Sequence, residues 1–470
     1  MRSELQNPRQ LVRMAHWWSM WLCLPWLLMV TACGPSSDGA VAPAQRTSAS
    51  QGNTPACPRS DSAPAGLYPV TAWKAAPSDA LITHPISGLS VRHALAPHWG
   101  GDWVRLRLSN RYSTAPVTLE NLHIAKEKSP GLPDMVAGTE CLLTFNGQPR
   151  VTLQAGQTVL SDWVQYPLRA FERVGVSFYA PEATPQLTRH LNANELVYVS
   201  MPGDHAAEAA GGAYQATPDG YASNFLVIEA LETAASKSVS TLVAVGDSIT
   251  DGSDSTTGFK DGQPSPMTST DQRYPDHLQR RLLTAGLPLT VANAGIGGNE
   301  LLKDGWLPQF GKALLDRFDA DVLQTAGVTH VLLMIGTNDF GNPKAGLPPT
   351  SEALIAGYKE LIARAHRAGL NIVLGTIPPA EGAVTEGLLV PLRVMHGTEQ
   401  ARRGRDEVNA WIRQQTLSDG VVDFATCLED PKRPGYLAPQ YNSGDNLHPT
   451  PAGYAAMAQC VDLRLFQTMD

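Results

Sequence analysis

The sequence predicts two folded domains: an all-β sandwich, followed by an α/β domain built on a parallel sheet. In residues 67–231, short runs alternate apolar with polar residues and are separated by turn residues, a period of two that is typical of antiparallel strands in a sandwich. In residues 241–470, short apolar runs alternate instead with amphipathic helical stretches, which indicates a parallel sheet covered by helices on both faces. The polar residues 232–240 are predicted to link the two domains.

The elements of the two domains differ in pattern. The first domain contains the runs WVRLRLSN, PVTLENLHIA, CLLTFNG, RVTLQAG, RVGVSFYA and ELVYVSM. The second contains the apolar runs TLVAVG, LTVANAG, VTHVLLMIG, NIVLGTI and GVVDF, with helices expected over DQRYPDHLQRRLLTAG and over residues 350–368, 399–415 and 451–466. The carboxyl ends of parallel strands meet at one edge of a sheet, so we expect functional residues that follow these strands to gather there.

The composition argues against nucleic acid as a partner. The 470 residues contain 36 Lys and Arg against 44 Asp and Glu, a formal net charge of −8, and no basic stripe interrupts that balance. The cysteines and histidines show no CxxC or HxxxH spacing, so no metal site is predicted.

The first 32 residues resemble an export signal. Three arginines precede the apolar run SMWLCLPWLLMV, which ends in VTAC. This ending resembles the lipobox of bacterial lipoproteins and implies that Cys33 is the lipidated first residue, which anchors the protein to a membrane. Gly34 is not the Asp that retains such lipoproteins at the inner membrane, so the outer membrane is favoured. The alternative is a short membrane anchor, or a plain signal with a chance cysteine.

A flexible tether is expected over residues 33–66, where Ala, Pro, Ser, Gly and Thr dominate and large apolar groups are rare. Export also places the remaining cysteines, Cys57, Cys141, Cys427 and Cys460, in an oxidising compartment, where two disulfides are expected. Pairing Cys57 with Cys141 and Cys427 with Cys460 closes the fewest long loops. Four buried free thiols are the alternative.

A candidate nucleophile follows the first strand of the predicted parallel sheet. The motif VAVGDSITDG places Ser248 on a strand-to-helix turn, where a serine is exposed and its own N–H points at the group that its hydroxyl attacks. Taken alone, the tripeptide GDS is also compatible with an ordinary helix N-cap. Ser248 therefore needs support from other residues.

Two further motifs place hydrogen-bond donors at the same edge. VANAGIGGN ends the second strand in a glycine-rich turn, where Gly298 can offer its N–H to a substrate oxygen. The spacing in GIGG differs from G-x-G-x-x-G, which argues against a dinucleotide site. LLMIGTNDFG places Asn338 after the third strand, where its amide can donate a second bond, although these residue types also populate plain turns.

A base and its carboxylate partner lie just before the last predicted helix. The motif SGDNLHPTPAGY places Asp445 and His448 three residues apart on one loop. A hydrolytic serine needs a base, and the base needs a carboxylate that fixes its tautomer, so this pair can supply both. A surface histidine beside a helix N-cap is the alternative.

In order along the chain, these four blocks resemble the SGNH branch of the GDSL hydrolases, which is named for Ser, Gly, Asn and His. The corresponding residues are Ser248, Gly298, Asn338 and His448, with Asp445 in the D-x-x-H block. The resemblance covers about residues 241–470 and implies a three-layer α/β/α domain with a five-stranded parallel sheet. Other stretches, such as NELLKDG and GYKELIARAHRAGL, look like the xylan-esterase-like subgroup, in which a β-sandwich precedes the hydrolase.

The resemblance implies a serine carboxylester hydrolase that works through an acyl-enzyme, and it implies no organic cofactor. Ser248 is then the nucleophile, His448 the base and Asp445 its orienting carboxylate, while the N–H groups of Ser248 and Gly298 and the Asn338 amide bind the oxyanion. Similar enzymes remove acetyl groups from polysaccharides, so an acetylated carbohydrate is the expected substrate. The alternatives are a lipase or lysophospholipase, a glycan O-acyltransferase, and an inactive surface protein that binds glycans.

Two features bear on the substrate. Residues 251–275 form a long polar insertion close to Ser248 in sequence, which we expect to be part of the substrate wall. Four tryptophans, Trp99, Trp103, Trp163 and Trp306, are candidates for stacking on sugars, although buried core is expected for most of them.

Overall fold

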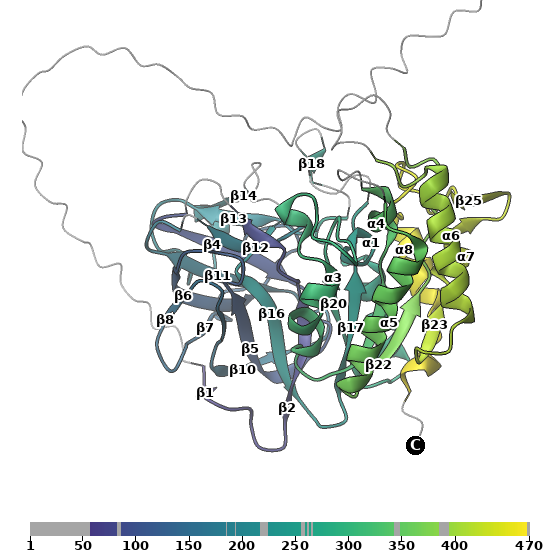
Figure 1. The fold of residues 1–470 in the computed structure, drawn as a ribbon. Helices are drawn as coiled ribbons and strands as arrows, with labels where there is room; N and C mark the ends of the chain where they lie inside the picture. Colours follow the sequence, from purple (N-terminus) through teal and green to yellow (C-terminus); the bar gives the residue numbers. More distant parts are fainter. Residues whose placement is uncertain are drawn as a thin grey trace, which may run out of the picture. The chain divides into compact units, whose positions relative to one another are not determined.

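The structure is a computed structural model and describes residues 57–81, 86–184, 186–192, 194–216, 224–254, 259–260, 263–264, 267–342, 348–384 and 394–467 (Figure 1). The expected signal, the lipidation candidate Cys33 and the first part of the expected tether lie outside these residues. Every helix in these ranges is too short or too polar to cross a membrane.

Antiparallel sheets make up the first half of the described chain, as the period-two pattern predicts. One sheet has the strand order β1-β10-β5-β16-β2, with β9 beside β5, and a second has the order β14-β13-β4-β11-β6-β7, with β8 beside β6; a third has the order β15-β12-β3. The strands are β1 (Arg59–Ser60), β2 (Tyr68–Lys74), β3 (Asp79–Leu81), β4 (Leu89–Leu95), β5 (Gly101–Ser109), β6 (Val117–Lys126), β7 (Cys141–Leu142), β8 (Arg150–Leu153), β9 (Thr158–Leu160), β10 (Trp163–Leu168), β11 (Val174–Ala180), β12 (Leu187–Leu191), β13 (Val197–Ser200), β14 (Tyr214–Ala216), β15 (Asn224–Leu226) and β16 (Ile228–Ala235).

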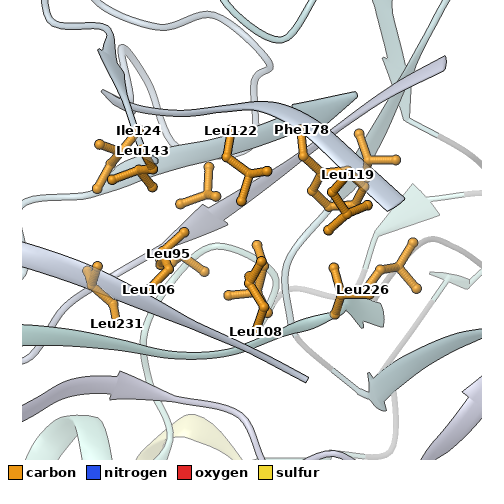
Figure 2. Close-up of a cluster of buried hydrophobic side chains, with 14 of the residues drawn as sticks. Leu95, Leu106, Leu108, Leu119, Leu122, Ile124, Leu143, Phe178, Leu226 and Leu231 are labelled. Atoms are coloured by element: carbon orange, nitrogen blue, oxygen red, sulfur yellow. The ribbon is translucent and has the colours of Figure 1, made fainter. Parts of the chain in front are cut away.

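One apolar cluster joins the two larger sheets. Its fully buried members include Leu106 and Leu108 of β5, Leu119 and Leu122 of β6, and Phe178 of β11. Figure 2 shows these side chains meeting between strands of the two sheets. Successive side chains of a strand point to opposite faces, so a period of two along the sequence predicts this packing.

The boundaries of this β domain differ from those expected. Its first residues lie inside the range 33–66 that was expected to be tether, because Cys57 is in a disulfide and Arg59–Ser60 pair with β10. At the other end, β16 runs through residues 232–235, which were expected to belong to the linker. The polar look of this segment comes from Glu232, which is fully buried and pairs with Arg105 and Arg107 of β5.

The predicted five-stranded parallel sheet is confirmed. Its order is β20-β17-β21-β22-β23, and the pairings are parallel throughout. The strands are β17 (Ser240–Gly246), β20 (Leu289–Gly295), β21 (Val328–Met334), β22 (Asn371–Gly375) and β23 (Gly420–Val422), and two short hairpins consist of β18 (Phe259–Lys260) with β19 (Gln263–Pro264) and β24 (Glu429–Asp430) with β25 (Arg433–Leu437). Alternate residues of β17 enter two different apolar clusters, so both faces of the sheet are covered.

Helices cover these two faces as the pattern predicts. Helices α3, α5 and α6 pack on one face, and α2 and α8 on the other (Figure 1). The helices are α1 (Ser248–Asp251), α2 (Tyr274–Thr284), α3 (Leu314–Phe318), α4 (Thr337–Gly341), α5 (Ser351–Arg367), α6 (Glu399–Gln414), α7 (Phe424–Leu428) and α8 (Pro451–Cys460), with 3-10 turns η1 (Gly211–Ala213), η2 (Pro308–Phe310) and η4 (Leu463–Phe466) and a π-helical turn η3 (Asp319–Leu323). The last helix ends earlier than expected, because Val461 is extended and Asp462 caps a separate 3-10 turn.

The cysteines pair as the loop argument predicts. Cys57 is bonded to Cys141 within the β domain, and Cys427 to Cys460 between α7 and α8. Each disulfide therefore connects elements within one domain.

The β domain packs directly against the α/β domain, through β2. The backbone N–H of Thr71 donates to Thr241 Oγ1 of β17 at 3.1 Å, and its carbonyl accepts from Thr290 Oγ1 of β20 at the same distance. Nearby, Arg111 forms an ion pair with Asp321 of η3 at 2.6 Å. The two domains thus share buried polar contacts as well as apolar ones.

Candidate active site

Ser248 lies where β17 ends and α1 begins. Asp247 is the N-cap residue of this short helix, and its carboxylate accepts the N–H of Ile249 at 3.0 Å. Ser248 is therefore the first helical residue, so its own N–H belongs to the helix start and is not used by the helix itself. Its side chain lies 2.8 Å from His448, where Oγ meets Nε2.

His448 and Asp445 lie on the loop that leads into α8. One carboxylate oxygen of Asp445 is 2.7 Å from His448 Nδ1, and the other accepts the backbone N–H groups of Leu447 and His448 at 2.9 and 2.8 Å. A carboxylate can only accept here, so Nδ1 carries the proton and Nε2 is free to accept the Ser248 hydroxyl proton. The serine, histidine and aspartate that the motifs single out thus form one continuous hydrogen-bonded chain.

The charges at the site favour this arrangement. Burial opposes ionisation of Asp445, but His448 and the backbone hydrogen bonds more than offset it and lower the pKa of this carboxyl to about 2. Burial likewise opposes the charged form of His448, yet Asp445, with smaller contributions from Asp247 and Asp254, raises the pKa of His448 above 6.5. Asp445 therefore stays ionised and stabilises the imidazolium that forms when Ser248 loses its proton.

The glycine turn after β20 lies beside this chain. Residues at the ends of β17 and β20 are paired, Gly246 with Gly295, so the turn that follows β20 emerges next to Ser248. Gly298 has φ +74°, and a Cβ there would lie 2.5 Å from the ring of Phe310. A side chain at this position would be strained by the positive φ and would clash with Phe310, so glycine allows the ring to pack directly on the turn.

Asn338 on α4 is held in a defined orientation. Its Nδ2 donates to the carbonyl of Asn299 at 3.0 Å, and its Oδ1 lies 3.0 Å from His396 Nε2. Burial lowers the pKa of His396 to about 3, so this ring is neutral and donates through Nε2–H. The second N–H of the Asn338 amide has no partner among the described residues and is available to an oxyanion.

Helix α4 is also tied to the glycine turn. The Asn342 side chain donates to the carbonyl of Gly298 at 3.3 Å, and the Asp339 carboxylate accepts the N–H groups of Leu301 and Leu302 at 2.8 and 3.1 Å. The two candidate oxyanion donors outside the serine block are therefore parts of one hydrogen-bonded unit.

Two residues at this site were not found by the sequence analysis. His396 has no sequence signal, since it resembles no motif. Arg317 occurs in LLDRFDADVL, where its spacing of four from Asp321 looks like an ordinary surface pair. In the structure it is buried and donates to the carbonyls of Gly246 and Ala294 and to Asn299 Oδ1, at 2.9 to 3.0 Å.

The candidate tryptophans differ in their surroundings. Trp163 is buried in the β domain, as expected for core, whereas Trp99 and Trp103 are partly exposed. Trp306 is also partly exposed and packs edge-to-face on Phe310, with ring centroids 5.7 Å apart. Because Phe310 covers Gly298, these two rings are the aromatic surface beside the glycine turn. No cluster of potential metal ligands occurs in the described ranges.

Comparisons with known proteins agree with the four motifs. Residues 244–456 match the model of the GDSL-like Lipase/Acylhydrolase family. Solved structures that are similar include a GDSL-like lipase from Bacteroides thetaiotaomicron, with 18% identity over 48% of this chain and 87% of that one and a TM-score of 0.33. An acetylxylan esterase from Geobacillus stearothermophilus shows 24% identity over 49% of this chain and 95% of that one, with a TM-score of 0.34. No curated protein matches the chain.

Replacing His396 by Leu should lower kcat by about 10- to 100-fold with KM changed less than about threefold, because the Asn338 amide loses the donor that orients it. His396→Gln, whose amide can still donate, should recover much of that loss. The matched control is His366→Leu, which removes an exposed histidine on α5. Steady-state kinetics on one soluble ester provide the test, and an unchanged kcat in His396→Leu would show that the contact is not needed.

The activity should rise with pH as His448 loses its proton, with a midpoint above 6.5. His448 must be neutral to accept the serine proton, and its raised pKa extends the protonated, inactive form to higher pH. Asp445, with a pKa of about 2, remains ionised across the measurable range and adds no second limb. The measurement is kcat/KM from pH 5 to 9, and a midpoint below 6.5 contradicts the assignment of His448 as the base.

Proposed function

We propose that this chain, whose residues 244–456 match the GDSL-like lipase/acylhydrolase family, is a carboxylic ester hydrolase that forms an acyl-enzyme on Ser248. The observation that carries the proposal is the continuous contact from Ser248 through His448 to Asp445, with distances of 2.8 and 2.7 Å. A hydroxyl, a neutral imidazole and an ionised carboxylate in this order are what a serine hydrolase needs.

The reaction has two halves. Ser248 Oγ attacks the ester carbonyl while its proton moves to His448 Nε2, and the carbonyl oxygen becomes an oxyanion. The N–H groups of Ser248 and Gly298 and the Asn338 amide stabilise that oxyanion. Collapse of the intermediate breaks the C–O bond to the alcohol, which leaves with the proton from His448.

The second half regenerates the enzyme. Water gives its proton to His448 and attacks the carbonyl carbon of the acyl group on Ser248. The oxyanion that forms is stabilised by the same hydrogen-bond donors as in the first half. The bond to Ser248 Oγ then breaks, the serine recovers its proton from His448, and the carboxylic acid is released. Every proton in the cycle passes through His448, which is why its orientation by Asp445 matters.

We assign acetylated carbohydrate as the substrate class. Trp306 and Phe310 provide a partly exposed aromatic surface beside Gly298, of the kind on which sugar rings stack. The insertion over residues 251–275 is rich in polar residues and follows Ser248 directly, which suits a hydrated substrate better than a fatty chain. The amino-terminal lipobox pattern adds the proposal that the enzyme is anchored at the outer membrane through Cys33.

Ser248→Ala should abolish ester hydrolysis while leaving the fold intact, because the hydroxyl is required for the chemistry. The expected loss in kcat is on the order of 10⁴-fold or more. A fluorophosphonate should label the wild type and not the variant, as intact mass would show. The control is Ser238→Ala, in an exposed turn between the domains. More than a tenth of the wild-type kcat in Ser248→Ala contradicts the assignment.

Acetyl esters should be preferred over longer acyl esters. We expect kcat/KM to fall at least about tenfold from p-nitrophenyl acetate to the octanoate, a difference of roughly 1.4 kcal/mol in transition-state binding. The opposite order would replace the carbohydrate esterase with a lipase and leave the roles of Ser248, His448 and Asp445 as they are.

A further inference from the structure

Two histidines of the β domain reach into the α/β domain, and both ring nitrogens of each face acceptors. His190, on β12, has Nδ1 2.8 Å from the carbonyl of Ala76 and Nε2 3.0 Å from the Asp251 carboxylate. His98 has Nδ1 2.7 Å from the carbonyl of Val291 and Nε2 2.9 Å from the Asp276 carboxylate. Each ring therefore connects a backbone carbonyl to a buried carboxylate of the α/β domain.

The partner of His190 is part of the candidate active site. Asp251 is the last residue of α1, the helix that Ser248 begins, and is 2% exposed. One of its carboxylate oxygens faces His190, and the other accepts the N–H of Gly297 at 3.0 Å. Gly297 directly precedes Gly298. A single carboxylate thus connects the β domain, the nucleophile helix and the glycine turn.

The loop between β12 and β13 packs on the glycine turn and on the end of α1. A Cβ on Gly297 would lie 2.6 Å from the Asn192 side chain, so this loop packs directly on the turn. Asn194 donates to the carbonyl of Gly252, the residue that ends α1, at 3.0 Å. These contacts come from a domain that the hydrolase motifs do not include.

We propose that His190 is a positioning residue for the ester hydrolase: it holds Asp251, which accepts the N–H of Gly297 and so anchors the start of the glycine turn that carries the Gly298 N–H toward the oxyanion. The inference rests on the proposed function. Two adjacent glycines have wide conformational freedom, so this turn depends on external hydrogen bonds for its geometry. A displacement of about 1 Å in such a donor can cost up to about 100-fold in rate.

A purely structural role, in which His190 only joins the domains, is the competing explanation, and His98 provides the control. It has the same pattern of two acceptors across the same pair of domains. Its partners are Asp276 on α2 and Val291, which lies four residues before the end of β20. Loss of His98 therefore loosens the interface without touching Gly297.

The test compares two substitutions of His190, each of which retains the hydrogen bond made by a different ring nitrogen. His190→Gln places an amide N–H near the position of Nε2 and keeps the bond to Asp251, whereas His190→Asn places one near Nδ1 and keeps only the bond to Ala76. We expect His190→Asn to lower kcat at least about tenfold with KM within about threefold. His190→Gln should stay within about threefold of wild type, and so should His98→Asn, although the last variant should melt at a lower temperature.

Two results overturn the inference: a kcat for His190→Asn above one third of the wild-type value, or equal losses of kcat in His190→Asn, His190→Gln and His98→Asn. If His190→Asn does not fold, substitutions of Asp251 test the same inference. Asp251→Ala should lose at least about tenfold in kcat, and Asp251→Asn, which can still accept from Gly297 and donate to His190, should recover most of that loss. Wild-type kcat in Asp251→Ala refutes the role. Absence of hydrolysis by the wild type itself contradicts the proposed function and is seen separately in the same assay.

Discussion

The guanidinium of Arg317 is buried at the carboxyl edge of the parallel sheet, where it contacts two of the four sequence blocks directly and a third through Asn299. It donates to the carbonyl of Gly246, which precedes the serine block, and to that of Ala294, which precedes the glycine turn. It also donates to Asn299 Oδ1, and the carbonyl of Asn299 in turn holds the Asn338 amide. The relative positions of Ser248 and the oxyanion donors therefore depend on one planar group with fixed donor directions.

A buried cation is tolerated there only because it is fully paired. Asp321 accepts from Arg317 at 3.1 Å and from Arg111 of the β domain at 2.6 Å. Burial opposes the charge on Asp321, but the two arginines more than offset it and lower the pKa of this carboxyl. Buried ion pairs contribute little net stability relative to apolar packing, yet removing one partner costs about 3–5 kcal/mol, so such a network strongly favours one geometry.

Side chains of the β domain pair with aspartates of the α/β domain. Arg111 pairs with Asp321, His98 with Asp276, His190 with Asp251, and Arg173 with Asp271. Through Asp321 and Asp251, two of these pairs connect to groups beside Ser248. The β domain is thus a structural component of the candidate site.

Local patterns in the sequence predicted the elements and most of the candidate site. Strands β17, β20 and β21 are followed by the Ser, Gly and Asn motifs, respectively, and because parallel strands share one edge, Ser248, Gly298 and Asn338 had to emerge together. The boundaries at residues 57–66 and 232–235 were missed for a physical reason. Composition alone makes Glu232 look like linker, whereas Arg105 and Arg107 neutralise it and allow it to be buried.

What the sequence determined by itself was the periodicity of burial, the turn chemistry and the order of the four blocks. Only the tertiary structure decided which distant groups orient them: Arg317 lies 71 residues from Gly246, His396 lies 58 from Asn338, and His190 lies 61 from Asp251. Periodicity reports which face of an element is apolar, and it carries no information about which buried donor meets which acceptor. Those pairs are selected by packing, because each polar group must find a partner once water has been removed.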